Sequence, residues 1–334
     1  APTTYSSYWN MTMKKILPYF EGKKLKLNEV KGKDIQNFCV HELKSVGANT
    51  VRHEYVLLHK MFKYAYRMDL VVNNPVEKVD PPRVDRYEGK PFTAEELKIL
   101  LNAAKDELLG LIILVTAMYG LRRSEVLGLR WRAIDFENDV ITINHTLTEV
   151  NFKGQTKLNP ADRTKNKSSC RTLPLSGSVK IRFIALRAQQ EENKKLCGNS
   201  YNKEWSDYVF VNEIGDIITP SYMESAFPKL LKKCGLEHRR FHDLRHTCAT
   251  LMNQQKVPLN HVQAYLGHSD IQTTSNIYTH LSWDDKTGSL QAMEKAVKVP
   301  VFEGQKNAWE NAKNQETSLI RKRGMEKGEK SLME

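Results

Sequence analysis

The chain has 334 residues, enough for two domains and a sizeable hydrophobic core. Lys and Arg number 51 against 39 Asp and Glu, and the resulting net charge of +12 favours a polyanionic partner such as nucleic acid. The longest uncharged apolar run, residues 108–121, is too short to cross a bilayer, and no basic amphipathic anchor stands out, so we expect no membrane association.

The cysteines and the N-terminus indicate the compartment. The five cysteines are scattered and form no Cys-x-x-Cys pair, which argues against a zinc site or a disulfide framework and favours a reducing bacterial cytosol. The first ten residues contain no apolar signal core, so nothing in them marks the chain for export. Because no initiator methionine is present, we expect a processed chain or a piece of a longer one.

The first 80 residues are predicted to be helical. Apolar residues recur at helical spacing in three segments, and Asn73-Asn74-Pro75 ends the last of them. These segments are residues 6–20, 33–45 and 50–70. Lys and Arg exceed Asp and Glu by 14 to 9 over residues 1–85, which fits a small helical DNA clamp as well as a solvated charged face.

A proline-rich stretch, residues 80–91, separates this helical part from the rest of the chain. It holds three prolines and a glycine and has no hydrophobic periodicity, as in a linker. Thr93 and Glu96 then form a capping box that opens the next helix. We therefore predict a helical domain, a linker, a larger domain and a C-terminal helix with a tail: residues 1–85, 86–92, 93–285 and 286–334.

The larger domain is predicted to be mainly α with a small antiparallel β-sheet, an α+β fold. Strands are expected where apolar residues alternate, and residues 153–167 are expected to form a polar loop with five basic side chains. The predicted strands are one or two within 135–150, one at 170–175, and a short hairpin at 208–211 and 216–218. The predicted helices cover residues 108–121, 180–196, 221–234, 242–254, 259–266 and 273–281.

Cationic, imidazole and phenol side chains recur in this domain in a fixed order. A planar guanidinium can bind two phosphate oxygens, histidine exchanges protons near neutral pH, and tyrosine is a candidate nucleophile toward phosphorus. Each of these side chains, taken alone, is more often a packed or surface residue. The motifs are Gly120-Leu121-Arg122-Arg123-Ser124-Glu125, Thr164-Lys165-Asn166-Lys167, His242-Asp243-Leu244-Arg245-His246, Leu266-Gly267-His268-Ser269 and Tyr278.

In order and spacing these motifs resemble the tyrosine recombinase (phage integrase) family. Within it they are most similar to the motifs of integrases from temperate phages and conjugative transposons. The likeness covers most of residues 92–285, and it implies that residues 1–85 form a helical core-binding (DNA-clamp) domain and residues 93–285 a catalytic domain. Carried over by position, it implies two catalytic arginines, two flanking histidines and a tyrosine nucleophile: Arg122, Arg245, His242, His268 and Tyr278. Arg123 adjoins Arg122 and could be the first catalytic arginine in its place, although the family's Gly-Leu-Arg motif favours Arg122. Lys165 aligns best with the family's catalytic lysine, with Lys167 as the alternative.

The resemblance also implies the chemistry and the partners. Tyr278 would attack a DNA phosphodiester and form a phosphotyrosyl bond while Lys165 protonates the leaving oxygen. No metal ion or nucleotide cofactor is expected. The expected partners are double-stranded DNA, further copies of the chain (a dimer on one site and a tetramer on two), and an accessory directionality factor. Residues 286–334 would dock on a neighbouring protomer or pack on their own domain.

Other classes of protein remain as alternatives. His242 and His246 have the spacing of a zinc-binding helix, but Asp243 replaces the expected glutamate and no third ligand is evident. Glu125 and Asp135 could form an acid/base pair, although support of Arg122 is the better interpretation. The remaining alternatives are a DNA-binding relative without catalysis and a type IB topoisomerase, which shares the chemistry and lacks synapsis.

Overall fold

The structure is a computed structural model that describes residues 2–84, 89–162 and 170–267. Its α-helices are α1 (Pro2–Met11), α2 (Leu17–Gly22), α3 (Gly32–Leu43), α4 (Ala48–Arg67), α5 (Ala94–Ala103), α6 (Leu108–Tyr119), α7 (Arg123–Leu127), α8 (Gly177–Cys197), α9 (Pro220–Lys233), α10 (Asp243–Gln254) and α11 (Leu259–Leu266). Its strands are β1 (Ile134–Asp135), β2 (Val140–Ile143), β3 (Thr146–Phe152), β4 (Gln155–Ala161) and β5 (Arg171–Pro174). The predicted α+β class, mainly helical with little sheet, is confirmed.

Helices α1 to α4 surround a hydrophobic core of their own, which extends from Ile16 to Val79. A π-helical segment, Thr12–Ile16, joins α1 to α2, so the first predicted helix is present but begins earlier, at Pro2. Helix α4 buries one stripe of apolar residues, including Leu58 and Phe62, as its 3.6-residue periodicity predicts. The helical content predicted for this part of the chain is therefore confirmed.

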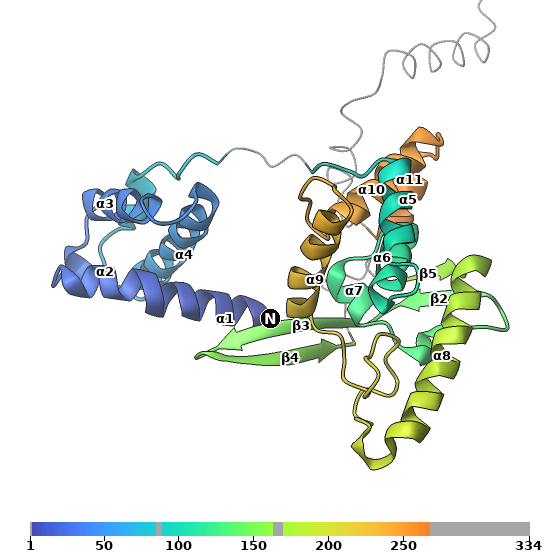
Figure 1. Cartoon of the computed structure of the whole chain (residues 1–334). Helices are drawn as coiled ribbons and strands as arrows, with labels where there is room; N and C mark the ends of the chain where they lie inside the picture. Colours follow the sequence, from blue (N-terminus) through green and yellow to red (C-terminus); the bar gives the residue numbers. More distant parts are fainter. Residues whose placement is uncertain (1, 85–88, 163–169, 268–334) are drawn as a thin grey trace, which may run out of the picture. The chain divides into compact units, whose positions relative to one another are not determined.

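A second hydrophobic core extends from Phe92 to Leu244 and includes side chains from every strand except β4. Helix α6 is apolar on all sides and largely buried, as expected for a helix at the centre of a domain. Helix α10 packs on it, and α5 and α11 lie beside the same pair (Figure 1). Among the described helices, none combines the length and the apolarity that a membrane crossing requires.

The described strands form two separate antiparallel sheets. In the first, β2 lies between β1 and β5, and Ile141 pairs with Leu173. In the second, β3 and β4 form a long hairpin over which α9 lies (Figure 1). Alternation in β5 buries Arg171 and Leu173 and exposes Thr172 and Pro174, so one strand face carries a charged side chain into the interior.

The prediction of a polar loop over residues 153–167 is wrong for its first half, where β4 pairs with β3 over seven residues. Gln155–Ala161 is polar and contains Pro160, a composition that disfavours strands. A two-residue turn joins the strands, with φ of +52° at Lys153 and +82° at Gly154, and this geometry matches the twist of a hairpin. The backbone ladder with β3 thus outweighs a weak local propensity.

Other expectations have mixed outcomes. The hairpin predicted at residues 208–218 is reduced to one bridge, Val211 with Ile217, closed by a turn at Gly215. Thr93 and Glu96 form the predicted capping box at the start of α5. Several predictions concern parts of the chain outside the described residues: Lys165, Lys167, His268, Tyr278, the helix at 273–281 and residues 286–334.

Candidate active site

Arg122 stands where the buried helix α6 ends and the chain turns. Gly120 caps α6 in the left-handed region, with φ of +56°, and a Cβ there would lie 2.1 Å from Leu266 Cδ2. Only glycine tolerates both the backbone angle and this close approach. Arg122 then takes the position before the first residue of α7, with its side chain 35% exposed. The turn therefore brings an arginine from a buried helix to the surface.

Glu125 is the buried carboxylate that holds this arginine. Its Oε1 accepts a hydrogen bond from Arg122 Nη1 at 2.6 Å, and its Oε2 accepts the Arg122 backbone N–H at 3.0 Å. Oε2 also accepts Arg171 Nη2 at 3.1 Å. The interpretation of Glu125 as a support for Arg122 is confirmed. Asp135, the other carboxylate considered for acid/base work, instead accepts bonds from residues 137 and 138 in its own turn.

Arg245 reaches the same carboxylate from helix α10. Its Nη1 lies 3.9 Å from Glu125 Oε2, and its side chain is 3% exposed. Nη1 donates to the Gly120 carbonyl oxygen at 2.6 Å, and Nη2 donates to the Leu266 carbonyl oxygen at 2.7 Å. These carbonyls end helices α6 and α11, where unpaired oxygens and the helix dipole attract a cation. Arg122 and Arg245, 123 positions apart in the sequence, therefore share one carboxylate.

Charge in this cluster is concentrated and mostly buried. Burial alone would raise the pKa of Glu125, but Arg171 and Arg122 lower it overall, so the group stays ionised near neutral pH. Burial and the adjacent Arg122 lower the pKa of Arg245 to about 9, which leaves it protonated at pH 7. Three guanidinium groups therefore face one carboxylate, and the excess positive charge suits a phosphate group.

His242 immediately precedes α10 and stands at the protein surface. The surrounding protein displaces part of the solvent from its imidazole, and His246 and Arg245 add positive charge, so its pKa falls to about 4. At neutral pH it therefore has one N–H donor and one acceptor nitrogen. The His246 ring packs edge-on against it, with 5.2 Å between centroids, and a Cβ on Gly89 would lie 3.0 Å from the His246 ring.

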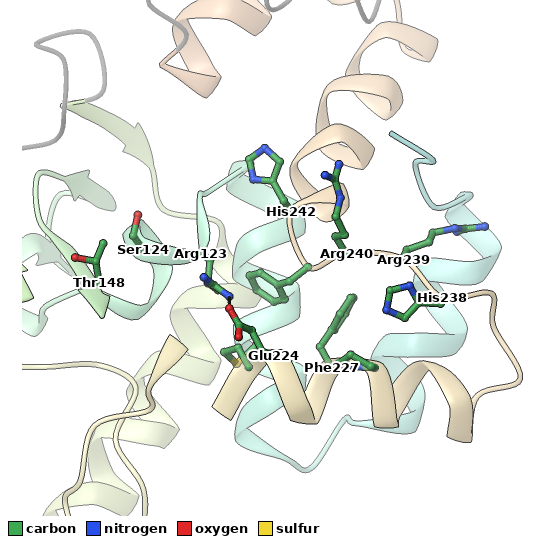
Figure 2. A pocket seen from close by; sticks show the side chains of 12 residues that line it. Arg123, Ser124, Thr148, Glu224, Phe227, His238, Arg239, Arg240 and His242 are labelled. Atoms are coloured by element: carbon green, nitrogen blue, oxygen red, sulfur yellow. Dashed lines mark hydrogen bonds and ion pairs between the residues drawn. The ribbon is translucent and has the colours of Figure 1, made fainter. Parts of the chain in front are cut away.

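A pocket of about 570 Å³ opens beside His242. Figure 2 shows His242 above the ion pair between Arg123 and Glu224, whose atoms are 2.6 Å apart. Arg123 thus pairs with α9, whereas Arg122 pairs with Glu125. The wall combines apolar side chains with polar and basic ones, including Ser124, Thr148, His238, Arg239 and Arg240. Arg239 and Arg240 are each paired with a carboxylate, Glu96 and Asp243.

Two ion-paired residues flank residues 163–169, the segment that contains Lys165 and Lys167: Asp162 directly before it and Arg171 two positions after it. Asp162 accepts hydrogen bonds from Arg130 at 2.9 Å and shares one of 2.8 Å with His145. Arg171 pairs with buried Glu125. The two lysines therefore lie, in the sequence, between an anchor at the end of β4 and another at the start of β5.

Sequence reasoning missed Arg171 as part of this cluster. The signal was present, because a predicted strand at residues 170–175 places Arg171 and Leu173 on one face, and a charged residue on an apolar face needs a buried partner. The carbonyl oxygens of Gly120 and Leu266 were also missed, since any residue carries one. Within the described ranges, no group of three or more His, Cys, Asp or Glu is arranged to hold a metal ion.

Comparison with known proteins identifies the class. The model of the phage integrase family matches residues 90–284. A tyrosine recombinase XerC-like protein of Caldanaerobacter subterraneus subsp. tengcongensis is 32% identical over 282 residues, which cover 80% of this chain and 72% of that protein. The chain belongs to the phage integrase family and is an enzyme of the tyrosine recombinase type, as its motifs predicted.

Solved structures agree in fold. The Tn1549 transposon integrase in complex with a circular intermediate DNA has a TM-score of 0.65 at 21% identity, over 80% of this chain and 86% of that one. The XerH site-specific recombinase bound to its palindromic difH substrate has a TM-score of 0.57 at 21% identity, over 85% of this chain and 76% of that one. Both likenesses concern the fold.

Proposed function

We propose that this recombinase cuts and rejoins DNA through a covalent bond between Tyr278 and a 3′-phosphate, so that a mobile element is integrated or excised. The observation that carries the proposal is the pairing of Arg122 and Arg245 on the single buried carboxylate of Glu125. Two arginines that are fixed in this way can bind the non-bridging oxygens of one phosphate. The Tn1549 and XerH structures, which contain DNA, favour the same substrate.

In the proposed reaction the Tyr278 hydroxyl oxygen attacks phosphorus, and the bond between phosphorus and the 5′-oxygen breaks. Negative charge gathers on the non-bridging oxygens, where Arg122, Arg245 and His268 donate hydrogen bonds. Lys165, or in its place Lys167, gives the leaving 5′-oxygen its proton. The 5′-hydroxyl of a second strand then attacks the phosphotyrosyl bond and releases Tyr278.

His242 is proposed to assist proton transfer. Because its pKa is about 4, its imidazole is neutral at pH 7 and can accept a proton at one nitrogen while it donates at the other. The ester to tyrosine keeps the energy of the broken bond, so resealing needs no nucleotide. Residues 1–85 are assigned to the DNA clamp and residues 93–285 to catalysis.

We also propose the assembly that strand exchange needs: a dimer on one DNA site and a tetramer on two, with residues 286–334 exchanged between protomers. An accessory directionality factor would select integration or excision. Chemical crosslinking with one-site and two-site DNA tests this assembly. A monomer that cleaves DNA and relaxes supercoils without joining two duplexes would instead identify a type IB topoisomerase.

The test of the function is covalent capture. The protein is incubated with a pool of nicked duplexes of randomised sequence, and adducts are separated on a denaturing gel. Wild type should form an adduct whose peptide carries a nucleotide on Tyr278, and Tyr278→Phe should bind DNA without forming one. Tyr265→Phe is the matched control, because the Tyr265 hydroxyl donates to the Met118 carbonyl oxygen at 3.1 Å. An adduct on another residue would refute the assignment, and its absence from wild type would favour a relative without catalysis.

A further inference from the structure

Arg171 is a buried cation that belongs to no sequence motif considered above. It lies on β5 opposite Ile143 of β2, and 6% of its side chain is exposed. A guanidinium in such a place needs a close anionic partner, because its desolvation is costly. That partner is Glu125, itself 1% exposed.

Glu125 divides its two oxygens among its donors. Oε1 accepts the Arg122 guanidinium at 2.6 Å, and Oε2 accepts the Arg122 backbone and Arg171. Arg245 Nη1 is 3.9 Å from Oε2, beyond hydrogen-bond distance, and binds the Gly120 carbonyl oxygen. Arg171 thus occupies the side of the carboxylate that faces Arg245.

We propose that Arg171 is a positioning residue for phosphate binding. By holding Glu125 Oε2, it keeps Oε1 directed at Arg122 and keeps Arg245 on its two carbonyl oxygens. The proposal rests on the proposed function, in which Arg122 and Arg245 bind the scissile phosphate. Without Arg171, Oε2 loses a charged donor, and Arg245 is the next guanidinium within reach of it.

This role differs from simple stabilisation of the fold. An ion pair that only supports packing would change the amount of folded protein or the rigidity of the domain as a whole. Arg171 instead touches Glu125, a carboxylate that both proposed catalytic arginines approach. A change at Arg171 should therefore weaken one step, the neutralisation of phosphate charge, more than any other.

The experiment compares two DNA substrates. Arg171→Met removes the charge and keeps an unbranched side chain, and adduct formation is followed on duplexes captured by wild type. One duplex carries the ordinary scissile phosphate, and the other carries a methylphosphonate, which has no negative charge to neutralise. We expect a loss of about 10- to 100-fold on phosphate DNA, the range for removal of a group that orients a ligand. A much smaller loss is expected on methylphosphonate DNA.

Arg239→Met is the matched control. Arg239 is 10% exposed and binds Glu96 through two hydrogen bonds of 2.6 and 2.8 Å, but it has no contact with Glu125 in the described structure. Its substitution should change the rates of adduct formation on phosphate DNA and on methylphosphonate DNA by the same factor. Equal factors for Arg171→Met on the two substrates, or a wild-type rate on phosphate DNA, would overturn the proposal. Failure of the wild-type protein to form any adduct would instead refute the proposed function.

A second measurement applies if Arg171→Met folds poorly, or if the wild-type protein reacts too slowly with methylphosphonate DNA. Arg171→Lys keeps a charge that can reach Glu125, so it should fold and lose part of the rate on phosphate DNA. Combined with Arg122→Lys, it should reduce the rate by less than the product of the single effects, because both changes act on one carboxylate. Independent, multiplied effects would contradict the proposal.

Discussion

The guanidinium of Arg245 donates a hydrogen bond of 2.6 Å to the carbonyl oxygen of Gly120, which lies 125 positions earlier in the chain. Through this bond the end of helix α6 holds a residue of helix α10. Arg122 follows Gly120 by two positions, so the same turn sets the place of both arginines. The local backbone at Gly120 therefore controls the geometry of the proposed phosphate site.

Gly120→Ala should damage this turn. A methyl group would meet Leu266 at 2.1 Å, and we expect a loss of about 1–3 kcal/mol for overpacking in addition to about 1 kcal/mol for the left-handed backbone. Gly235→Ala is the control, because Gly235 follows helix α9 with a φ of +68°, in a cap closed by the bond from Leu236 N–H to the Leu231 carbonyl oxygen, and no atom lies within 4 Å of its Cβ position. Urea unfolding measures both. Equal losses would show that the contact with Leu266 is unimportant.

The pH dependence of stability in the N-terminal helices gives a second prediction. Glu54 is buried with its Oε2 unbonded in the described structure, and burial and then Glu42 raise its pKa to about 7 from 4.5. Because the folded pKa is the higher one, stability is full below about pH 4.5 and is lost as pH rises through 7. Between pH 5 and pH 8, the free energy of unfolding of Glu54→Gln should therefore rise relative to that of wild type by up to about 3 kcal/mol.

Hydrogen exchange of α4 amides at the two pH values measures this difference, since the N-terminal helices have a core of their own. Glu54→Gln should protect these amides more than wild type at pH 8, and the advantage should shrink at pH 5. A constant difference between the proteins would show that Glu54 does not titrate in this range.

Binding to DNA should depend strongly on salt. The net charge of +12 implies contacts with several phosphates, and log K should fall with log salt by about 0.9 for each phosphate that is neutralised. Fluorescence anisotropy with a labelled duplex at several salt concentrations measures the slope. A binding curve that does not change between low and physiological salt would argue against nucleic acid as the partner.

The fold class and most helices could be predicted from the sequence, because their signals are local. Helix α6 is a continuous apolar run, and Thr93 with Glu96 forms a capping box that depends on three residues of separation. Strand β4 was missed because its stability comes from pairing with β3, and a polar segment carries little local evidence of that pairing.

For the site too, local motifs could be predicted from the sequence, whereas tertiary contacts could not. Arg122 and Arg245 stood out by motif, but their convergence on Glu125 depends on tertiary contacts across more than a hundred residues. Arg171 joins the cluster through the register of β5 with β2, which no local pattern determines. The roles of Lys165, His268 and Tyr278 stay predictions from their motifs, outside the described residues.

Substitution of the two adjacent arginines separates their roles. Arg122→Lys keeps the charge but loses the planar fork, so adduct formation should fall by about 10²–10³-fold, as for loss of one donor to a transition-state oxygen. Arg123 pairs with exposed Glu224, and such surface pairs contribute little, so Arg123→Lys should have a small effect. Single-turnover cleavage measures both. A steep loss of cleavage rate for Arg123→Lys, with little loss for Arg122→Lys, would assign the catalytic role to Arg123.

The general acid is decided by a change of leaving group. If Lys165 protonates the departing 5′-oxygen, Lys165→Ala should stall on ordinary DNA and recover when sulfur replaces that oxygen, because a thiolate leaves without a proton. Lys167→Ala is the neighbouring control and should cleave both substrates nearly as wild type does. Adduct formation on the two substrates measures the recovery. Recovery in Lys167→Ala and not in Lys165→Ala would assign the acid to Lys167. Recovery in neither would show that the proton comes from another group.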